Sequence, residues 1–293
     1  MTQYLLYLYA ESPVHTGAAD SIDVLDLPVQ REAATGYPVI WGQSLKGALR
    51  QAASDADWGD RIRQIFGSAI EQQDEDGGTT PGTLAVGDAQ LVAMPVPALR
   101  HTFAWLTTEI ALSRLARKYT VLGRDVPALP QVRDDAGAAA SGAWVQSAKE
   151  VLGPCLIQLG TSPDEKLAGW AERIAVDVFA PGEAFQPFAR KLRDDLVLAG
   201  SDIAPVLLRE CTEQAVRVQL SESKTVENGP FYSEYLPAET IMAAQLTLRE
   251  GGDTEDSRQA LRELLHERLL QVGGDETLGK GLMWGRLLEG QRS

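Results

Sequence analysis

The sequence predicts an α+β protein built on a ferredoxin-like or RRM-like sheet that carries long insertions. Two observations carry this prediction. The start of the 293-residue chain reads as strand, helix and strand, and its last part reads as strand, helix and a glycine-rich strand. The middle follows neither pattern and supplies the insertions. This length allows one large domain, or one core domain with long insertions.

A helix is predicted between the first two strands. Ser44 has the short hydroxyl side chain that caps helices, and the apolar positions of residues 45–53 share one helical face. Lys46 and Arg50 then lie together on another face, one turn apart. The flanking apolar segments predict strands over residues 4–9 and 83–96.

The middle of the chain predicts helices, loops and one hairpin. Helical periodicity marks residues 107–118, 167–178 and 188–197. Acidic or Ala- and Gly-rich composition marks loops at residues 71–82 and 134–142. Val216, Val218 and Leu220 alternate with polar residues and predict a strand, while residues 231–235 predict its return strand after a tip at 221–230.

The last part of the chain predicts the remaining half of the sheet. Residues 240–248 read as a strand. Within residues 254–270 the leucines recur on one stripe, which is the pattern of a helix with one buried face. Residues 273–288 are glycine-rich and then apolar, without helical spacing, and predict the final strand.

Composition excludes several protein classes. The chain has no run of about 18 apolar residues, so no membrane span is predicted, and its N-terminus lacks the features of a signal peptide. We therefore expect a cytoplasmic location. Cys155 and Cys211 stand far apart and predict reduced core thiols. The net charge of -14 argues against a simple nucleic-acid binder, although a local basic groove on an acidic body is compatible with it.

The glycine-rich segment 273–286 is the most distinctive local motif. Gly274 to Lys280 fits the P-loop spacing, but Gly281 stands where a Ser or Thr would hold Mg²⁺. The segment also follows a helix instead of a buried strand, so nucleotide hydrolysis is rejected. Two interpretations stay open. The glycines either let backbone amides approach phosphates or serve a tight turn alone. The residues concerned are Gly273, Gly274, Gly279, Lys280 and Gly281.

Three further features are candidates for chemistry. Asp20, Asp23 and Asp26 lie close in sequence, and such carboxylates bind a hard cation or accept a proton. Spacing alone favours turn roles for them. His15 precedes Asp26 by eleven positions and is as compatible with a structural as with a functional role. Lys46 and Arg50 beside a helix start fit an anion site, but taken alone this pattern favours a solvated helix face.

Taken together, three N-terminal segments resemble the RAMP-superfamily backbone subunits of the type III-B (Cmr) CRISPR complex. They are SPVHTG at 12–17, VLDLPVQRE at 24–32 and TGYPVIWGQSLKGALR at 35–50. Weaker agreement extends through residues 87–96, 103–107 and 224–237 and the glycine-rich tail. The resemblance covers most of the chain, and the first fifty residues are its most specific part.

The resemblance implies an RRM-like palm with inserted fingers and a thumb hairpin. Residues 1–55, 83–96 and 238–293 would form the palm, residues 56–82 and 97–237 the insertions, and residues 216–237 the thumb. Two departures weaken the finger and thumb assignments. Pro97 and Ala98 stand where the family is expected to have Arg and Ser, and Ser233 stands where a second acid is common.

The family's activity implies a role in antiviral defence. Its subunits stack along a guide RNA, and each thumb kinks the guide–target duplex at six-nucleotide intervals. An aspartate in the loop after the first strand then cleaves the target RNA with a divalent cation, Mg²⁺ or Mn²⁺. By resemblance this residue is Asp26, either as metal ligand or as proton acceptor, with His15 in support. The reaction would be attack of the ribose 2′-OH on the adjacent phosphate.

The resemblance also implies partners and binding residues. The guide backbone would be held by Lys46, Arg50, Arg31, Ser44 and the glycine-rich loop, with Glu234 and Tyr235 as thumb candidates. Partners would be the guide RNA, single-stranded target RNA, copies of the chain and other Cmr-complex subunits.

Two alternatives stay open. The chain would be a non-catalytic RNA-binding filament subunit if Asp26 is a turn residue. It would be an unrelated metabolic enzyme if the glycine-rich loop binds a phosphorylated small molecule.

Overall fold

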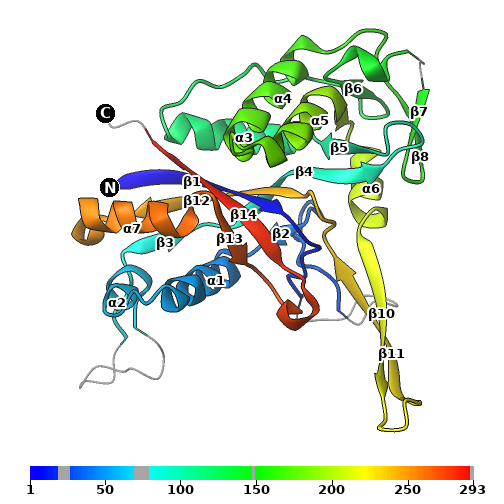
Figure 1. Cartoon of the computed structure of the whole chain (residues 1–293). Helices are drawn as coiled ribbons and strands as arrows, with labels where there is room; N and C mark the ends of the chain where they lie inside the picture. Colours follow the sequence, from blue (N-terminus) through cyan, green and yellow to red (C-terminus); the bar gives the residue numbers. More distant parts are fainter. Residues whose placement is uncertain (19–26, 69–78, 147–148, 291–293) are drawn as a thin grey trace.

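One ten-stranded sheet organises the molecule (Figure 1). The structure is a computed structural model that describes residues 1–18, 27–68, 79–146 and 149–290. The strand order is β13 (Arg268–Gln271), β14 (Leu282–Glu289), β1 (Thr2–Ala10), β12 (Ile241–Leu248), β4 (Ala89–Pro97), β5 (Phe103–Thr107), β9 (Leu196–Ala199) and β6 (Gly137–Ala139). Two short strands join it at the side, β2 (Val39–Ile40) on β4 and β3 (Leu84–Val86) on β12.

Helices and two separate hairpins complete the structure. The α-helices are α1 (Gly42–Asp55), α2 (Arg61–Phe66), α3 (Glu109–Val121), α4 (Glu165–Val178), α5 (Gln186–Asp195), α6 (Ala204–Glu210) and α7 (Glu255–Leu265). Short 3-10 turns are η1 (Gly142–Trp144), η2 (Glu183–Phe185), η3 (Glu250–Gly252) and η4 (Glu276–Leu278). The hairpins pair β7 (Lys149–Leu152) with β8 (Cys155–Gln158), and β10 (Glu213–Leu220) with β11 (Val226–Tyr235).

The central four strands have the ferredoxin-like arrangement. In chain order, β1, α1, β4, β12, α7 and β14 give the pattern strand-helix-strand-strand-helix-strand. In space the strands lie in the order β14, β1, β12 and β4, and every neighbouring pair is antiparallel. The predicted fold class is therefore confirmed. Strands β5, β9 and β6, which come from the middle of the chain, extend the same sheet.

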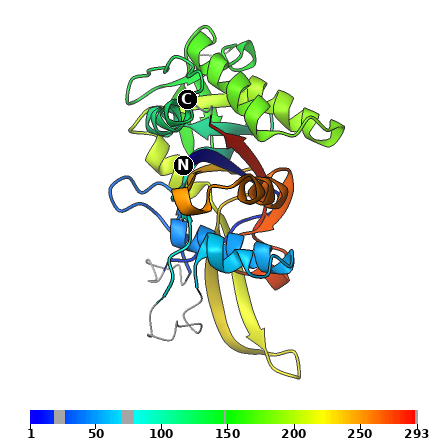
Figure 2. The same cartoon turned by 90° about the vertical axis from the view of Figure 1, so that its left-hand side faces the viewer.

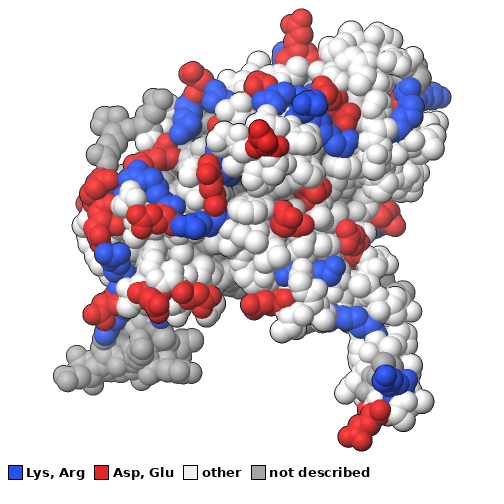
Figure 3. Space-filling view, viewed as in Figure 1, with Lys and Arg blue, Asp and Glu red and all other residues white. Residues whose placement is uncertain are grey.

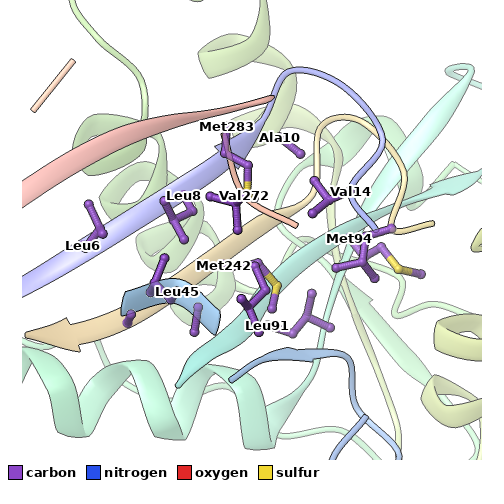
Figure 4. Packing of buried hydrophobic residues seen from close by; sticks show 14 of the residues in the cluster. Leu6, Leu8, Ala10, Val14, Leu45, Leu91, Met94, Met242, Val272 and Met283 are labelled. Carbon is purple, nitrogen blue, oxygen red and sulfur yellow. The ribbon is translucent and has the colours of Figure 1, made fainter. Parts of the chain in front are cut away.

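Both faces of the sheet are covered. Side chains of β1 alternate, because successive residues of a strand point to opposite faces. Leu6 and Leu8 pack into the cluster beneath α1, α2 and α7 (Figure 4). Leu5 and Tyr7 pack into a second cluster with α3, α4 and α5, which lie on the other side (Figure 1). The result is a helix–sheet–helix sandwich with two apolar cores.

Two predicted elements were wrong. The helix expected over residues 254–270 ends at Leu265, since Glu267 has a positive φ of 57° and the chain turns back as β13 to pair with β14. Residues 134–142 were expected to be a mobile loop but contain the buried strand β6. Its small residues allow close packing, and a Cβ atom at Gly137 would lie 2.7 Å from the carbonyl oxygen of Leu198.

The β10–β11 hairpin confirms the strand pair expected near residue 216 and projects from the body (Figures 1 and 2). Its tip around Ser221–Thr225 is closed by hydroxyl contacts between Ser221, Ser223 and Thr225. Among the helices that the structure describes, none is long and apolar enough to cross a membrane.

Candidate functional site

Asp26, the main catalytic candidate, lies outside the described residues. The residues on either side of its segment are described and lie close together, because the Ala18 amide donates to the Pro28 carbonyl over 2.9 Å. Leu27 follows Asp26 directly. Its amide donates to the Tyr232 carbonyl, and its carbonyl accepts from the Glu234 amide, at 3.1 and 2.9 Å. The chain is therefore held against the base of the hairpin one residue after Asp26.

His15 also lies at the hairpin base. It is buried, and its Nδ1 lies 2.8 Å from the Glu234 carbonyl oxygen. A carbonyl oxygen only accepts, so Nδ1 carries a proton and donates it to this bond. A Cβ atom at Gly17 would approach Nε2 to 2.9 Å, which explains the glycine there. The ring centroids of His15 and Tyr235 lie 5.5 Å apart.

Glu234 joins the hairpin to the segment that follows Asp26. Its buried carboxylate accepts from the Val29 amide at 3.0 Å, from Thr212 Oγ1 at 2.8 Å and from Arg31 Nη2 at 2.6 Å. The Arg31 guanidinium also donates to the carbonyls of Gly36 and Leu208. Both side chains are thus engaged within the protein, and RNA binding by Arg31 stays a prediction.

Tyr235 points to the opposite side of the same strand and meets the glycine-rich loop. Its hydroxyl donates to Asp275 Oδ2 at 2.7 Å, and Arg217 donates two further bonds to the same carboxylate at 2.8 and 2.9 Å. Burial raises the pKa of Asp275, but the hydrogen bonds from Arg217 and Tyr235 outweigh burial and hold the pKa below its usual range. Asp275 is therefore ionised at neutral pH.

The glycine-rich loop packs against the segment that contains His15. Gly273 and Gly281 have positive φ angles of 90° and 80°. A Cβ atom there would lie 2.3 Å from the His15 oxygen and 2.4 Å from the Val272 oxygen, respectively. Five loop amides donate to protein carbonyls: Gly274 to His15, Leu278 and Lys280 to Asp275, Gly279 to Glu276 and Gly281 to Pro13. These amides point inward, which favours the turn-and-packing interpretation over a phosphate cradle.

Ser44 was wrongly predicted as the cap of α1. The helix starts two residues earlier, at Gly42, and Ser44 is an exposed residue within it. The Gly42 amide donates to the Asp88 carboxylate at 2.7 Å, so an acid from another segment occupies the helix start. Gly42 lies too close to β3 for a side chain, since a Cβ atom would approach the Val86 oxygen to 2.5 Å.

Lys46 and Arg50 belong to a cluster of cations on α1. Burial, and then the charges of Arg249 and Arg50, lower the pKa of Lys46. Arg50 Nη1 donates to the Gly67 carbonyl at 2.9 Å. Within the described part of the chain, no ion pair joins these three cations to a carboxylate. Elsewhere on the face seen in Figure 3, basic and acidic side chains are interspersed.

An open groove of 1010 Å³ connects α1 with the glycine-rich loop. Ser44 and Gly47 line it on the helix side, and Gly273 and Glu276 line it on the loop side. The sheet itself offers no comparable surface. RRM proteins stack bases on an exposed sheet face, whereas helices cover both faces here.

The described residues contain no group of three or more His, Cys, Asp and Glu side chains placed to hold a metal ion. At the hairpin base the carboxylates of Glu234 and Asp275 are bound by Arg31 and Arg217, and so are not available as ligands. Asp20, Asp23 and Asp26, the carboxylates selected from the sequence as cation ligands, lie outside the described residues and stay candidates. Sequence reasoning missed Arg217, Asp275 and Asp88, although Asp275 lies inside the glycine-rich motif.

Residues 7–284 match the sequence model of the RAMP superfamily. The chain belongs to this superfamily. Among RAMP proteins, the CRISPR system Cmr endoribonuclease Cmr4 of Pyrococcus furiosus is 32% identical over 293 residues, covering 97% of this chain and 95% of the relative.

Solved RAMP structures share the whole fold. The crystal structure of oligomeric Cmr4 from Pyrococcus furiosus matches with a TM-score of 0.75 at 26% identity, and the match covers 100% of both chains. A chain of the type III-B Cmr-beta complex bound to cognate target RNA, solved by cryo-electron microscopy, matches with a TM-score of 0.72 at 20% identity. That match covers 97% of this chain and 96% of the other, and it concerns the fold.

Proposed function

We propose that this RAMP protein is a guide-RNA-binding backbone subunit of a type III-B CRISPR effector complex and cleaves target RNA at six-nucleotide intervals. The observation that carries the proposal is the similarity, over nearly the full length of both chains, to a relative named as a Cmr endoribonuclease. Guide RNA, single-stranded target RNA, further copies of the chain and other Cmr-complex subunits are its partners in this proposal.

The division into palm, fingers and thumb stays part of the proposal. The palm would comprise residues 1–55, 83–96 and 238–293, and the thumb residues 216–237. The placement of His15 beside Glu234 and Tyr235 at the hairpin base supports the assignment of the thumb, because candidates from two distant parts of the chain meet there. Leu27 is bonded to the same hairpin strand through the Tyr232 carbonyl and the Glu234 amide.

The proposed reaction is an attack of the ribose 2′-OH on the adjacent phosphorus. The 2′-oxygen forms a bond to phosphorus, the bond from phosphorus to the 5′-oxygen breaks, and the leaving oxygen takes up a proton. The products are a 2′,3′-cyclic phosphate and a 5′-hydroxyl end. Asp26 either accepts the 2′-OH proton or binds a divalent cation, which would stabilise negative charge on the phosphate. Alignment of the attacking oxygen supplies much of the rate.

The other candidates have supporting roles. His15 is held by the Glu234 carbonyl and lies against the Tyr235 ring, which fixes the position of its imidazole at the hairpin base. Lys46 and Arg50 supply positive charge for the guide backbone from another face of α1, where each lines a hollow separate from the groove. Lys280, whose Nζ lies 5.1 Å from the Tyr235 ring centroid, adds charge at the loop.

Substitution of Asp26 tests the proposal in the assembled complex. Asp26→Ala should abolish cleavage of the bound target at every six-nucleotide position and leave guide binding intact, because the change removes a carboxylate and no large side chain. Single-turnover cleavage of end-labelled target RNA measures the rate. Asp256→Ala is the matched control, since Asp256 is an exposed acid on α7 that pairs with Arg61. Unchanged cleavage by Asp26→Ala would identify the chain as a non-catalytic subunit.

A second measurement tests the chemistry itself. A target RNA with one 2′-deoxynucleotide on the 5′ side of a cleavage position should resist cleavage there and be cut normally at the others. Cleavage at the modified position would exclude 2′-OH attack.

A further inference from the structure

Two adjacent residues at the end of β11 attach the hairpin to the body, one on each face of the strand. Glu234 and Tyr235 are neighbours in the strand and therefore point to opposite faces. On one face, Glu234 binds Arg31 and Val29. On the other face, Tyr235 binds Asp275 of the glycine-rich loop, and Arg217 of β10 binds the same carboxylate. We call Arg217, Asp275 and Tyr235 the hairpin clamp.

The hairpin clamp has the geometry of a specific contact. The Arg217 guanidinium donates two parallel hydrogen bonds to Asp275, one to each oxygen, and Nη2 also donates to Ser233 Oγ at 2.7 Å. Such a two-pronged pair fixes the direction as well as the distance between its partners. The side chains of Arg217 and Asp275 are 32% and 18% exposed, so water shields the pair only in part.

Asp275 is held in place by its own loop. Its φ angle is 62°, a conformation that Asp tolerates better than most residues. The amide of the preceding Gly274 donates to the His15 carbonyl at 2.8 Å, and the Asp275 carbonyl accepts from Leu278 and Lys280. The carboxylate therefore belongs to the same rigid corner as His15, and the clamp ties the hairpin to that corner.

Toward its tip, past the contacts at its base, the hairpin has little support from the rest of the protein. Residues 222–231 are exposed, and Val216, Val218, Val226 and Phe231 are all more than a third exposed. A two-stranded hairpin alone is marginally stable in water. Figures 1 and 2 show it extending away from both helical layers. Its direction therefore depends on the contacts at its base.

We propose that the hairpin clamp fixes the direction in which the hairpin leaves the body, and that it thereby positions the target RNA for cleavage in the assembled complex. Arg217 and Asp275 are positioning residues that act through the hairpin and touch no reacting atom. This inference rests on the proposed function and adds two residues to it. A small rotation at the base moves the tip by a larger distance, so loss of the clamp misaligns the RNA.

A double-mutant cycle in the assembled complex tests the clamp. The variants are Arg217→Ala, Asp275→Asn and the double variant, and Asn is chosen because it also tolerates a positive φ. Each single variant should lower the single-turnover cleavage rate about tenfold, since misplacement by about 1 Å already costs up to about 100-fold. The double variant should be no slower than the slower single variant, because both changes break one contact.

Two further readouts separate positioning from a general loss of stability. The single variants should spread the cuts over neighbouring nucleotides, while the melting temperature of the subunit and its guide binding stay at the unmodified level. Arg217→Lys, which keeps the charge and the fold but loses the second hydrogen bond, should cut faster than Arg217→Ala. Arg61→Ala, which breaks an exposed pair on the far side of the body, is the control and should cut normally.

The outcomes distinguish this inference from the function on which it rests. If Asp26→Ala abolishes cleavage but the single clamp variants cut at the unmodified rate and positions, the clamp proposal is wrong and the nuclease proposal stands. A double variant whose loss is the product of both single losses also overturns the clamp. If Asp26→Ala cuts normally, the nuclease proposal itself fails.

Discussion

Glu239, at the turn into β12, is an acid without a counter-charge. Within the described part of the structure its Oε2 is buried and accepts no hydrogen bond. Burial raises the pKa of Glu239 to about 7. Its backbone is nevertheless used, since the Glu239 carbonyl accepts from Trp105 Nε1 at 2.8 Å and its amide donates to Ala10. The residue is held by its backbone while its side chain opposes folding at high pH.

Replacement of Glu239 by Gln should make the protein less sensitive to pH. The folded protein holds the Glu239 proton up to pH about 7, whereas the unfolded chain releases it near its ordinary value of 4.5. Between these values the folded state binds more protons, so stability falls as pH rises. Glu239→Gln should therefore stabilise the protein at pH 8 by about 1 kcal/mol, allowing for partial solvent screening, and have little effect at pH 4.5.

Urea unfolding at pH 4.5 and pH 8 measures this difference. Glu250→Gln, at an exposed acid in η3, is the control and should leave the pH dependence unchanged. Equal effects of Glu239→Gln at both pH values would contradict the prediction.

For single residues, the sequence predicts the candidates for the functional site better than it predicts the partners that these residues contact. His15, Glu234 and Tyr235 were selected by resemblance, and the structure brings them together. The partners of Glu234 and Tyr235 were not predictable, because Arg31 lies 203 positions from Glu234 and Asp275 lies 40 positions from Tyr235. Nothing local in the sequence marks either pair.

At the scale of elements, the start of α1 shows how a local rule fails. Ser44 is followed by a helical pattern, which satisfies the usual cap signal. The Asp88 carboxylate, immediately before β4, satisfies the Gly42 amide and lets the helix begin earlier. Because this cap comes from a residue 46 positions away, the sequence next to the helix does not predict it.

The two candidate caps of α1 make opposite predictions. Asp88→Ala should lower the free energy of unfolding by about 1 kcal/mol, because the Gly42 amide loses its acceptor. Ser44→Ala should leave it nearly unchanged, since Ser44 is exposed inside the helix. Urea unfolding of both variants checks the pair. A larger loss for Ser44→Ala would reverse the assignment.

The helix-to-strand boundary after α7 failed for a related reason. Leu269 continues the leucine stripe of the helix, and the helix was predicted to end at Leu270. In the structure these two residues lie in β13, where they pair with Trp284 and Met283 of β14. Pairing of this segment with β14 at the sheet edge outweighs its helical periodicity. The periodicity of one segment carries no information about strand pairing with a distant segment.

At the scale of the whole molecule, one sheet serves two apolar cores. Leu6 lies in the core under α1 and α7, and Ile174 of α4 lies in the core on the other face, and both are fully buried. Strand β1 contributes side chains to both cores. The two helical layers therefore share a common element, and we expect them to unfold together.

Two core substitutions test this coupling. Leu6→Ala and Ile174→Ala should each lower the free energy of unfolding by about 2–5 kcal/mol, because each leaves a cavity in a packed core. Each variant should still unfold in one calorimetric transition, shifted to lower temperature. A separate early transition in Ile174→Ala would show that the α3–α5 layer unfolds independently.

The central sheet was predictable because its strands and helices follow one after another with clear periodicities. The extension of that sheet by β5, β9 and β6 was not, since β6 consists of Gly and Ala, which read as loop. Covering of the second sheet face by α3, α4 and α5 also depends on contacts between distant segments.

The position of β1 between β12 and β14 has a consequence for synthesis of the chain. Strands β12 and β14 are translated roughly 230 and roughly 270 residues after β1, which takes on the order of 10–60 s at about 5–20 residues per second. During that interval a strand of the sequence TQYLLYLYA has emerged from the ribosome without either neighbour. An apolar strand in this condition is a target for chaperones. The hairpin base also needs Asp275, and so it is completed only after β12 and α7 have been translated.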